Sequence, residues 1–161
     1  MLERCRRLEE RAAAVYRSYA AAARTDPALC ALWTALAREE EEHTESLSQA
    51  RTQMEPTAGG RTWLEGWDEA LGAVDVCLTA AEWLGADALS ARQLSAALEL
   101  EMTELEAIRH VLLAACPTPY AAGPDQHAVR LADAAQRLSD DPQVRLQVAL
   151  FRARTWLKKA G

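Results

Sequence analysis

The sequence predicts an all-α protein: an antiparallel four-helix bundle with a helical crossover and one extra short helix. Half of its 161 residues are hydrophobic and 26% are charged, but it has only seven glycines and six prolines. This composition is typical of helical proteins. Apolar residues also recur every three or four positions in long segments, which is the periodicity of an amphipathic helix. We therefore expect one helical domain over residues 1–161.

The helices are placed by this periodicity and by residues that favour a helix start. Asp26-Pro27 and Asp141-Pro142 each combine a capping residue with a proline suited to the first helical position, and Ser90-x-x-Gln93 is typical of a capping box. The predicted helices cover about residues 2–24, 27–52, 62–84, 90–116, 126–138 and 142 onward, with loops at 54–61 and 117–125. Helix 62–84 is interpreted as the crossover between two helical hairpins, and helix 126–138 has no clear place in the bundle.

Charge and missing motifs disfavour several functional classes. The net charge is −6 and no basic stripe is present, which argues against partners such as nucleic acid or an anionic membrane. No apolar run approaches the length of a membrane span, and the charged N-terminal segment does not resemble a signal peptide, so a cytoplasmic protein is expected. The four cysteines form no C-x-x-C pair and are expected to be small buried hydrophobic residues. The absence of a nucleophile elbow argues against a hydrolase.

The acidic run over residues 39–42 ends beside one of only three histidines. Glu40 and His43 fall on the apolar stripe of the second helix, whereas Glu39, Glu41 and Glu42 lie off it and are expected to be solvated. The stripe also contains Leu29, Trp33, Leu36 and Leu47. A buried glutamate must be compensated, because an unpaired buried charge is costly. Glu-x-x-His places both side chains on one face, where they can bind one metal ion.

Two other helices each place one glutamate on an apolar stripe. Glu9 lies among Cys5, Ala12, Tyr16, Tyr19 and Ala23 in the first helix, and Glu101 lies among Leu94, Leu98, Leu105, Ile108 and Leu112. Each glutamate alone is a weak signal, because such residues often pair with arginine or lie at a bundle end. Three carboxylates and a histidine together predict a metal site made of Glu9, Glu40, His43 and Glu101. His110 and His127 are expected at the surface.

These segments resemble the rubrerythrin-like branch of the ferritin-like di-iron carboxylate proteins. LEERAAAVYRSYA resembles the first helix of that family, with Glu9 seven residues before Tyr16. DPALCALWTALAREEEEHTESL resembles the second, with Glu40 and His43 as ligands, and LSAALELEMTELEAIRHVL resembles the third, with Glu101. The resemblance implies six ligands that hold two irons, which react with oxygen or peroxide. It would make the protein an oxidoreductase of rubrerythrin or ferroxidase type.

The last helix departs from the family pattern. Its capped start repeats that of the second helix, but the register carries Glu40 onto Thr155 and His43 onto Lys158, so the second Glu-x-x-His is missing. The remaining ligands suffice for one ion of iron, manganese or zinc, and a second metal is in doubt unless Glu104 or water contributes. Lys158 could instead supply positive charge among the carboxylates.

Two functional hypotheses therefore stay open. In the first, the protein binds metal for iron, oxygen or peroxide chemistry and uses an external electron donor, while Tyr16 or Tyr19 orients a carboxylate ligand. In the second, it is a metal-free structural or binding module. A homodimer is expected, because the five tryptophans could be buried in an interface as readily as in the core. No catalytic residue can be assigned from the sequence.

Overall fold

The computed structural model describes the backbone of residues 1–53, 67–115 and 124–160, and the side chains of 1–52, 67–104 and 127–153. These parts of the chain are all helical and contain no strand, which confirms that the fold is all-α. The elements are α1 (Leu2–Ala22), the 3-10 helix η1 (Ala23–Thr25), α2 (Pro27–Gln53), α3 (Trp67–Leu84), α4 (Ser90–Ala115), α6 (Pro124–Leu138) and α7 (Pro142–Ala160). The two predicted loops, 54–61 and 117–125, fall wholly or mostly outside the described residues.

The predicted aspartate caps are formed. Asp26 Oδ1 accepts hydrogen bonds from the backbone N–H groups of Ala28 (3.0 Å) and Leu29 (3.1 Å) at the start of α2. Asp141 caps the start of α7 in the same way. Each carboxylate therefore satisfies backbone donors that have no partner within the helix.

The break between α3 and α4 lies where it was predicted, but its hydrogen bonds differ from a capping box. Gly85 follows α3 with a φ of 73°, a conformation that glycine adopts without a steric cost. The Gln93 side-chain amide donates to the carbonyl oxygen of Ala86 at 2.9 Å. Gln93 therefore fastens the turn rather than returning to the start of its own helix.

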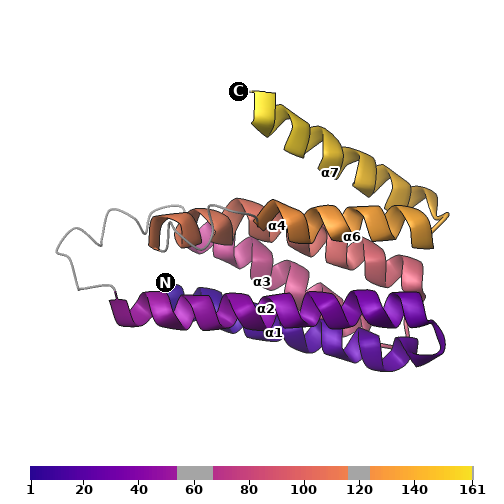
Figure 1. The fold of residues 1–161 in the computed structure, drawn as a ribbon, viewed down its shortest axis with the longest axis horizontal. Coiled ribbons are helices and arrows are strands. Elements are labelled where there is room, and N and C mark those ends of the chain that lie inside the picture. The colour runs from indigo at the N-terminus through magenta and orange to yellow at the C-terminus, as the bar shows by residue number, and fades with distance from the viewer. Residues whose placement is uncertain (54–66, 116–123, 161) are drawn as a thin grey trace.

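The helices other than α7 pack side by side with their long axes roughly aligned (Figure 1). α1 and α2 form one antiparallel hairpin and α3 and α4 form another, joined by contacts between α1 and α3. α3 is therefore a packed member of the bundle, paired with α4, rather than a crossover between two hairpins. α6 lies against both α4 and α2, so the short helix without a predicted place completes the ring of helices.

α7 lies outside this ring. It packs on α4 and α6, and Figure 1 shows it crossing on the side of these helices that faces away from α1 and α2. The sequence prediction gave the last helix the fourth place in the bundle. In the described part of the chain the ring instead consists of α1, α2, α3, α4 and α6, because α6 rather than α7 packs against α2 as well as α4.

The predicted apolar stripes form the core. Trp33 is fully buried, its ring stacks on Tyr16 with centroids 5.9 Å apart, and it meets Tyr19 edge to face at 5.3 Å. Such aromatic pairs fill volume and add specific contacts. The described part of the chain contains no helix long and apolar enough to cross a membrane. Beside the aromatic cluster, the core holds four buried glutamates and a buried histidine, namely Glu9, Glu40, Glu101, Glu104 and His127.

Candidate metal centre

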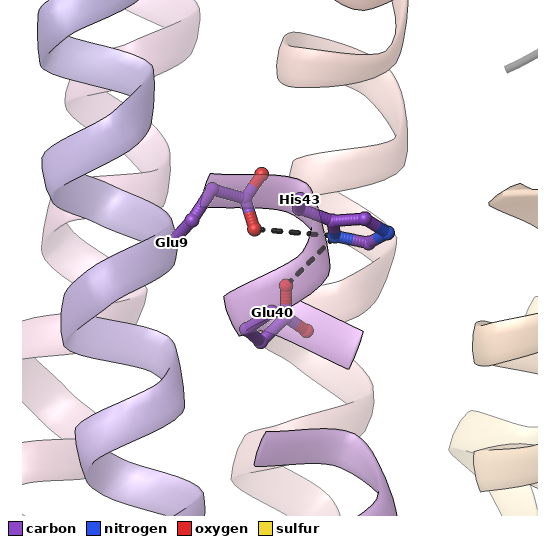
Figure 2. Close-up of side chains that lie close together, drawn as sticks. All are labelled: Glu9, Glu40 and His43. Atoms are coloured by element: carbon purple, nitrogen blue, oxygen red, sulfur yellow. Dashed lines mark hydrogen bonds and ion pairs between the residues drawn. The ribbon is translucent and has the colours of Figure 1, made fainter. Parts of the chain in front are cut away.

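The first part of the candidate site joins α1 to α2. His43 Nδ1 lies 2.9 Å from Glu40 Oε2 and 3.4 Å from Glu9 Oε2. Figure 2 draws both contacts as dashed lines. Glu9 and Glu40 are buried, and the His43 side chain is 25% exposed. One turn of α2 places Glu40 and His43 on the same face, as expected of Glu-x-x-His. The structure thus brings together three of the four predicted ligands.

His127 adds a second histidine, and its predicted surface position is wrong. The residue is only 4% exposed and lies near the start of α6. Its Nε2 lies 2.9 Å from Glu101 Oε1 and 3.3 Å from Glu40 Oε1. The ring also stacks near that of His43, with centroids 5.9 Å apart. α6 therefore delivers an imidazole between the carboxylates of α2 and α4.

Glu39 is also not the solvated residue that the sequence predicted. Its side chain is only 14% exposed, and its Oε2 lies 2.8 Å from His127 Nδ1. Arg130, also on α6, forms an ion pair with Glu39 Oε1. Glu41 and Glu42, by contrast, are exposed as predicted. The docking of α6 explains the difference, because it covers the side of α2 that carries Glu39.

Glu101 and Glu104 come from successive turns of α4. The Tyr16 hydroxyl donates to Glu101 Oε1 at 2.7 Å within the core, which is the contact expected of a residue that orients this carboxylate. Glu104 is 7% exposed, and its Oε1 is buried without a hydrogen-bond partner. A buried carboxylate oxygen without a partner is costly. Glu104 Oε1 is therefore expected to bind a proton, a water molecule or a metal ion.

The carboxylates differ in how their surroundings shift their pKa values. Burial would raise the pKa of Glu9, but hydrogen bonds with Glu40 and His43 hold it below the ordinary value. Burial and then the charge of Glu9 raise the pKa of Glu40 well above its usual range. Burial and the charges of Glu9 and Glu101 do the same for Glu104. The cluster therefore retains protons when it holds no cation, as crowded buried carboxylates must.

Both histidines favour their charged form. Burial lowers the pKa of His43, but the hydrogen bond and charge of Glu9, with the charges of Glu101 and Glu104, raise it to about 9. Burial likewise lowers the pKa of His127, and the charges of Glu101 and Glu40 raise it well above the usual range. Two imidazolium ions and shared protons therefore balance the negative charge. A divalent metal ion would displace these protons, since its ligands must be deprotonated.

Two overlapping groups of side chains could hold a metal ion. One is Glu9, Glu40 and His43, and the other is Glu40, Glu101 and His127; in each group the ligand atoms lie within 4.8 Å of one another. Glu40 belongs to both. Such nitrogen and oxygen donors suit iron, manganese and zinc. The structure thus supplies a second histidine that the sequence prediction lacked.

The spacing of apolar residues that predicts a buried Glu40 also predicts a buried His127. His127, Leu131, Ala134 and Leu138 follow the spacing of an apolar stripe, and the first three are buried. Applied to helix 126–138, the periodicity predicts an inward-facing histidine. The residue was missed because that helix was given no place in the bundle. Neither Lys158 nor Thr155, nor the surface prediction for His110, can be assessed, since their side chains lie outside the described residues.

Comparisons of the chain with protein-family models, with curated proteins and with solved structures gave no match. The resemblance to ferritin-like carboxylate proteins thus depends on four candidate ligands alone. These are Glu9, Glu40, His43 and Glu101, each placed by its helix at one point of the bundle.

Proposed function

We propose that this protein binds two metal ions in a carboxylate–histidine centre of the ferritin-like kind. The observation that carries the proposal is the position of His127, which closes a second group of ligands around the shared Glu40. Without His127 the carboxylates have one histidine and suit one ion. With it, each of two adjacent positions has a histidine nitrogen and at least two carboxylate oxygens.

The residues present fit such a centre in number and chemistry. Glu9, Glu40, Glu101 and Glu104 offer carboxylate oxygens, and His43 and His127 offer nitrogens, which equals the di-iron carboxylate bundles in number and kind of ligand, although Glu104 lies outside both ligand groups and only α2 carries Glu-x-x-His. Glu104 Oε1 and Glu40 Oε1 are both buried without a hydrogen-bond partner, so each could accept a cation. The raised pKa values of Glu40 and Glu104 indicate a site with too much negative charge for its burial. Metal ions would relieve that repulsion.

Iron held by such ligands reacts with oxygen or peroxide, and the protein would then act as an oxidoreductase that takes electrons from an external donor. The chain prepares the site for this chemistry in two ways. Tyr16 fixes the orientation of Glu101 through its hydroxyl group. Burial of Glu9 and Glu40 keeps water away, whereas the partly exposed His43 marks the side nearest to solvent. Small reactants would enter from that side.

Metal analysis of protein expressed with added iron tests this proposal. We expect about two ions per chain, as in the di-iron bundles with this ligand number. Glu40→Ala should remove both, because Glu40 belongs to both groups. Glu42→Ala is the matched control from the same acidic run and should leave the metal content unchanged, since Glu42 is exposed. Protein free of metal under all conditions would contradict the proposal.

A metal-free structural or binding module remains the second candidate. It is favoured by the pairing of both histidines with carboxylates, which balances charge without a metal ion. In this case added iron or cobalt would leave the melting temperature unchanged. If the two-metal centre is correct, the ions should raise it, because a ligand that binds only the folded state stabilises that state.

A further inference from the structure

We propose that Glu39 is a positioning residue that holds the His127 imidazole in the orientation needed to bind metal. The inference rests on the proposed metal centre and assigns a role to a glutamate outside both ligand groups. Glu39 would act through His127, from the side of the ring opposite the site.

The two ring nitrogens of His127 face different carboxylates. Nδ1 lies 2.8 Å from Glu39 Oε2, whereas Nε2 lies 2.9 Å from Glu101 Oε1 and 3.3 Å from Glu40 Oε1. A neutral imidazole carries its proton on one nitrogen only. A carboxylate beside Nδ1 keeps the proton there and leaves the Nε2 lone pair for a metal ion. Histidine ligands commonly have such a partner, which fixes the tautomer and the ring orientation.

Glu39 is itself held in place, unlike its exposed neighbours in the acidic run. Arg130 forms an ion pair with Glu39 Oε1, and His127 Nδ1 lies at ion-pair distance from Oε2 without the geometry of a hydrogen bond, so both oxygens face charged groups of α6. The Glu39 side chain is 14% exposed. The side chains of Glu41 and Glu42 are 53% and 61% exposed and pair with exposed arginines. Exposed ion pairs of that kind contribute little to the stability of the fold. Glu41 and Glu42 can therefore serve as control positions for Glu39.

A purely structural role for Glu39 makes a different prediction. Glu39 joins α2 to α6 through two contacts, and a simple tether would stabilise the fold whichever metal group is present. A positioning residue affects only the group that contains His127. The two roles are separated by testing Glu39 in variants that retain one metal group each.

Cobalt(II) titration, followed by visible absorbance, makes this comparison. His43→Ala retains Glu40, Glu101 and His127, and His127→Ala retains Glu9, Glu40 and His43. In the His43→Ala background, Glu39→Ala should weaken cobalt binding about 10- to 100-fold, the usual effect of losing the partner of a histidine ligand. In the His127→Ala background it should change binding by less than about threefold, because no imidazole is left to position. Glu42→Ala should have no effect in either background.

Glu39→Gln provides a conservative variant. Its amide oxygen can accept a hydrogen bond from Nδ1–H at the position of Glu39 Oε2, so it should recover most of the affinity that Glu39→Ala loses in the His43→Ala background. This variant also carries the test if Glu39→Ala does not fold, as judged by circular dichroism. Because a neutral amide oxygen is a weaker acceptor than a carboxylate, Glu39→Gln should then cause a smaller part of that loss in the His43→Ala background and none in the other. Equal losses in both backgrounds, or none in either, would overturn the inference.

The design separates failure of this inference from failure of the proposed function. If neither single-group background nor the parent protein binds cobalt, the metal centre is wrong and the role of Glu39 falls with it. If the parent and both backgrounds bind cobalt but Glu39→Ala behaves like Glu42→Ala, the metal centre stands and only the positioning role is wrong.

Discussion

At the scale of single residues, the candidate site depends most on Glu40, which shares a buried space with other charged side chains. Glu40 belongs to both groups of candidate ligands and contacts both histidines. Its carboxylate is 1% exposed, so its charge must be met by protons, imidazolium ions or metal ions. Tyr16, Glu39 and Arg130 surround the ligands and hold them. Each of these contacts can be removed separately.

Replacing Tyr16 tests whether its hydroxyl group orients a metal ligand. Tyr16→Phe removes the 2.7 Å hydrogen bond to Glu101, and we expect it to lower the free energy of unfolding by about 1–3 kcal/mol. Tyr19→Phe is the matched control, because the Tyr19 hydroxyl donates to the carbonyl oxygen of Ala81 at 2.9 Å. Both variants should lose stability, but only Tyr16→Phe should weaken cobalt binding. Equal affinities in a titration would contradict this role of Tyr16.

The pKa of His43 predicts how the stability of the metal-free protein changes with pH. Burial lowers this pKa, but Glu9 and the other carboxylates raise it from 6.5 to about 9 in the folded state. The stabilising effect of the bound proton is complete below 6.5 and is lost as the pH rises through 9. We expect the free energy of unfolding to fall by about 1–3 kcal/mol between these values, since one pKa unit corresponds to about 1.4 kcal/mol.

Urea denaturation of chelator-treated protein at pH 6.5 and 9.5 measures this change. His43→Asn should reduce the difference between the two pH values, because it removes a titrating group. Metal affinity should change in the opposite direction and increase with pH, since protons compete with metal for the same ligands. A metal-free protein that gains stability on going to pH 9.5 would show that the direction assigned to His43 is wrong.

At the scale of helices, α6 decides whether the site has one histidine or two. It packs on both α2 and α4 and buries Ala128, Leu131, Ala132 and Ala135 against them and the rest of the core. His127 and Arg130 then reach Glu39 from successive turns. The second metal group is therefore complete only when α6 is packed against α2 and α4.

Leu131→Ala tests the packing of α6. Leu131 is fully buried, so its truncation should lower the free energy of unfolding by about 2–5 kcal/mol. Leu146→Ala in α7 makes the same chemical change at a side chain that is 58% exposed, and it should cost less than about 0.5 kcal/mol. Thermal or urea denaturation compares the two variants. Similar losses would mean that α6 is not held as the structure describes.

At the scale of the whole molecule, α3 presents exposed apolar side chains. Trp83 is 87% exposed and Val76, two turns earlier, is 69% exposed. Contiguous exposed apolar patches often mark an interface, and the spacing of seven residues puts these two side chains on one face of α3. We therefore keep the proposal of a homodimer and place its contact on this face of α3. Sedimentation analysis should find a dimer that Trp83→Ser weakens, and a monomeric parent protein at micromolar concentration would contradict it.

The sequence predicts the helices and the inward glutamates well, because both follow from local periodicity. The start of α2 at Pro27 and the burial of Glu9, Glu40 and Glu101 all agree with the structure. The order of helices around the bundle does not follow from local pattern. It depends on which helix best covers the gap between α2 and α4. Assigning that place to the last helix instead of α6 led to the wrong surface predictions for both His127 and Glu39.

The central claim is that two metal ions lie between the helices, one beside each histidine. Anomalous X-ray diffraction from crystals grown with iron or cobalt tests it most directly. We expect two peaks that share Glu40 as a neighbour, the first beside Glu9 and His43 and the second beside Glu101 and His127. Crystals of His127→Ala should lose the second peak alone. A metal-soaked crystal without a peak near Glu40, or with His127 turned to solvent, would contradict the account.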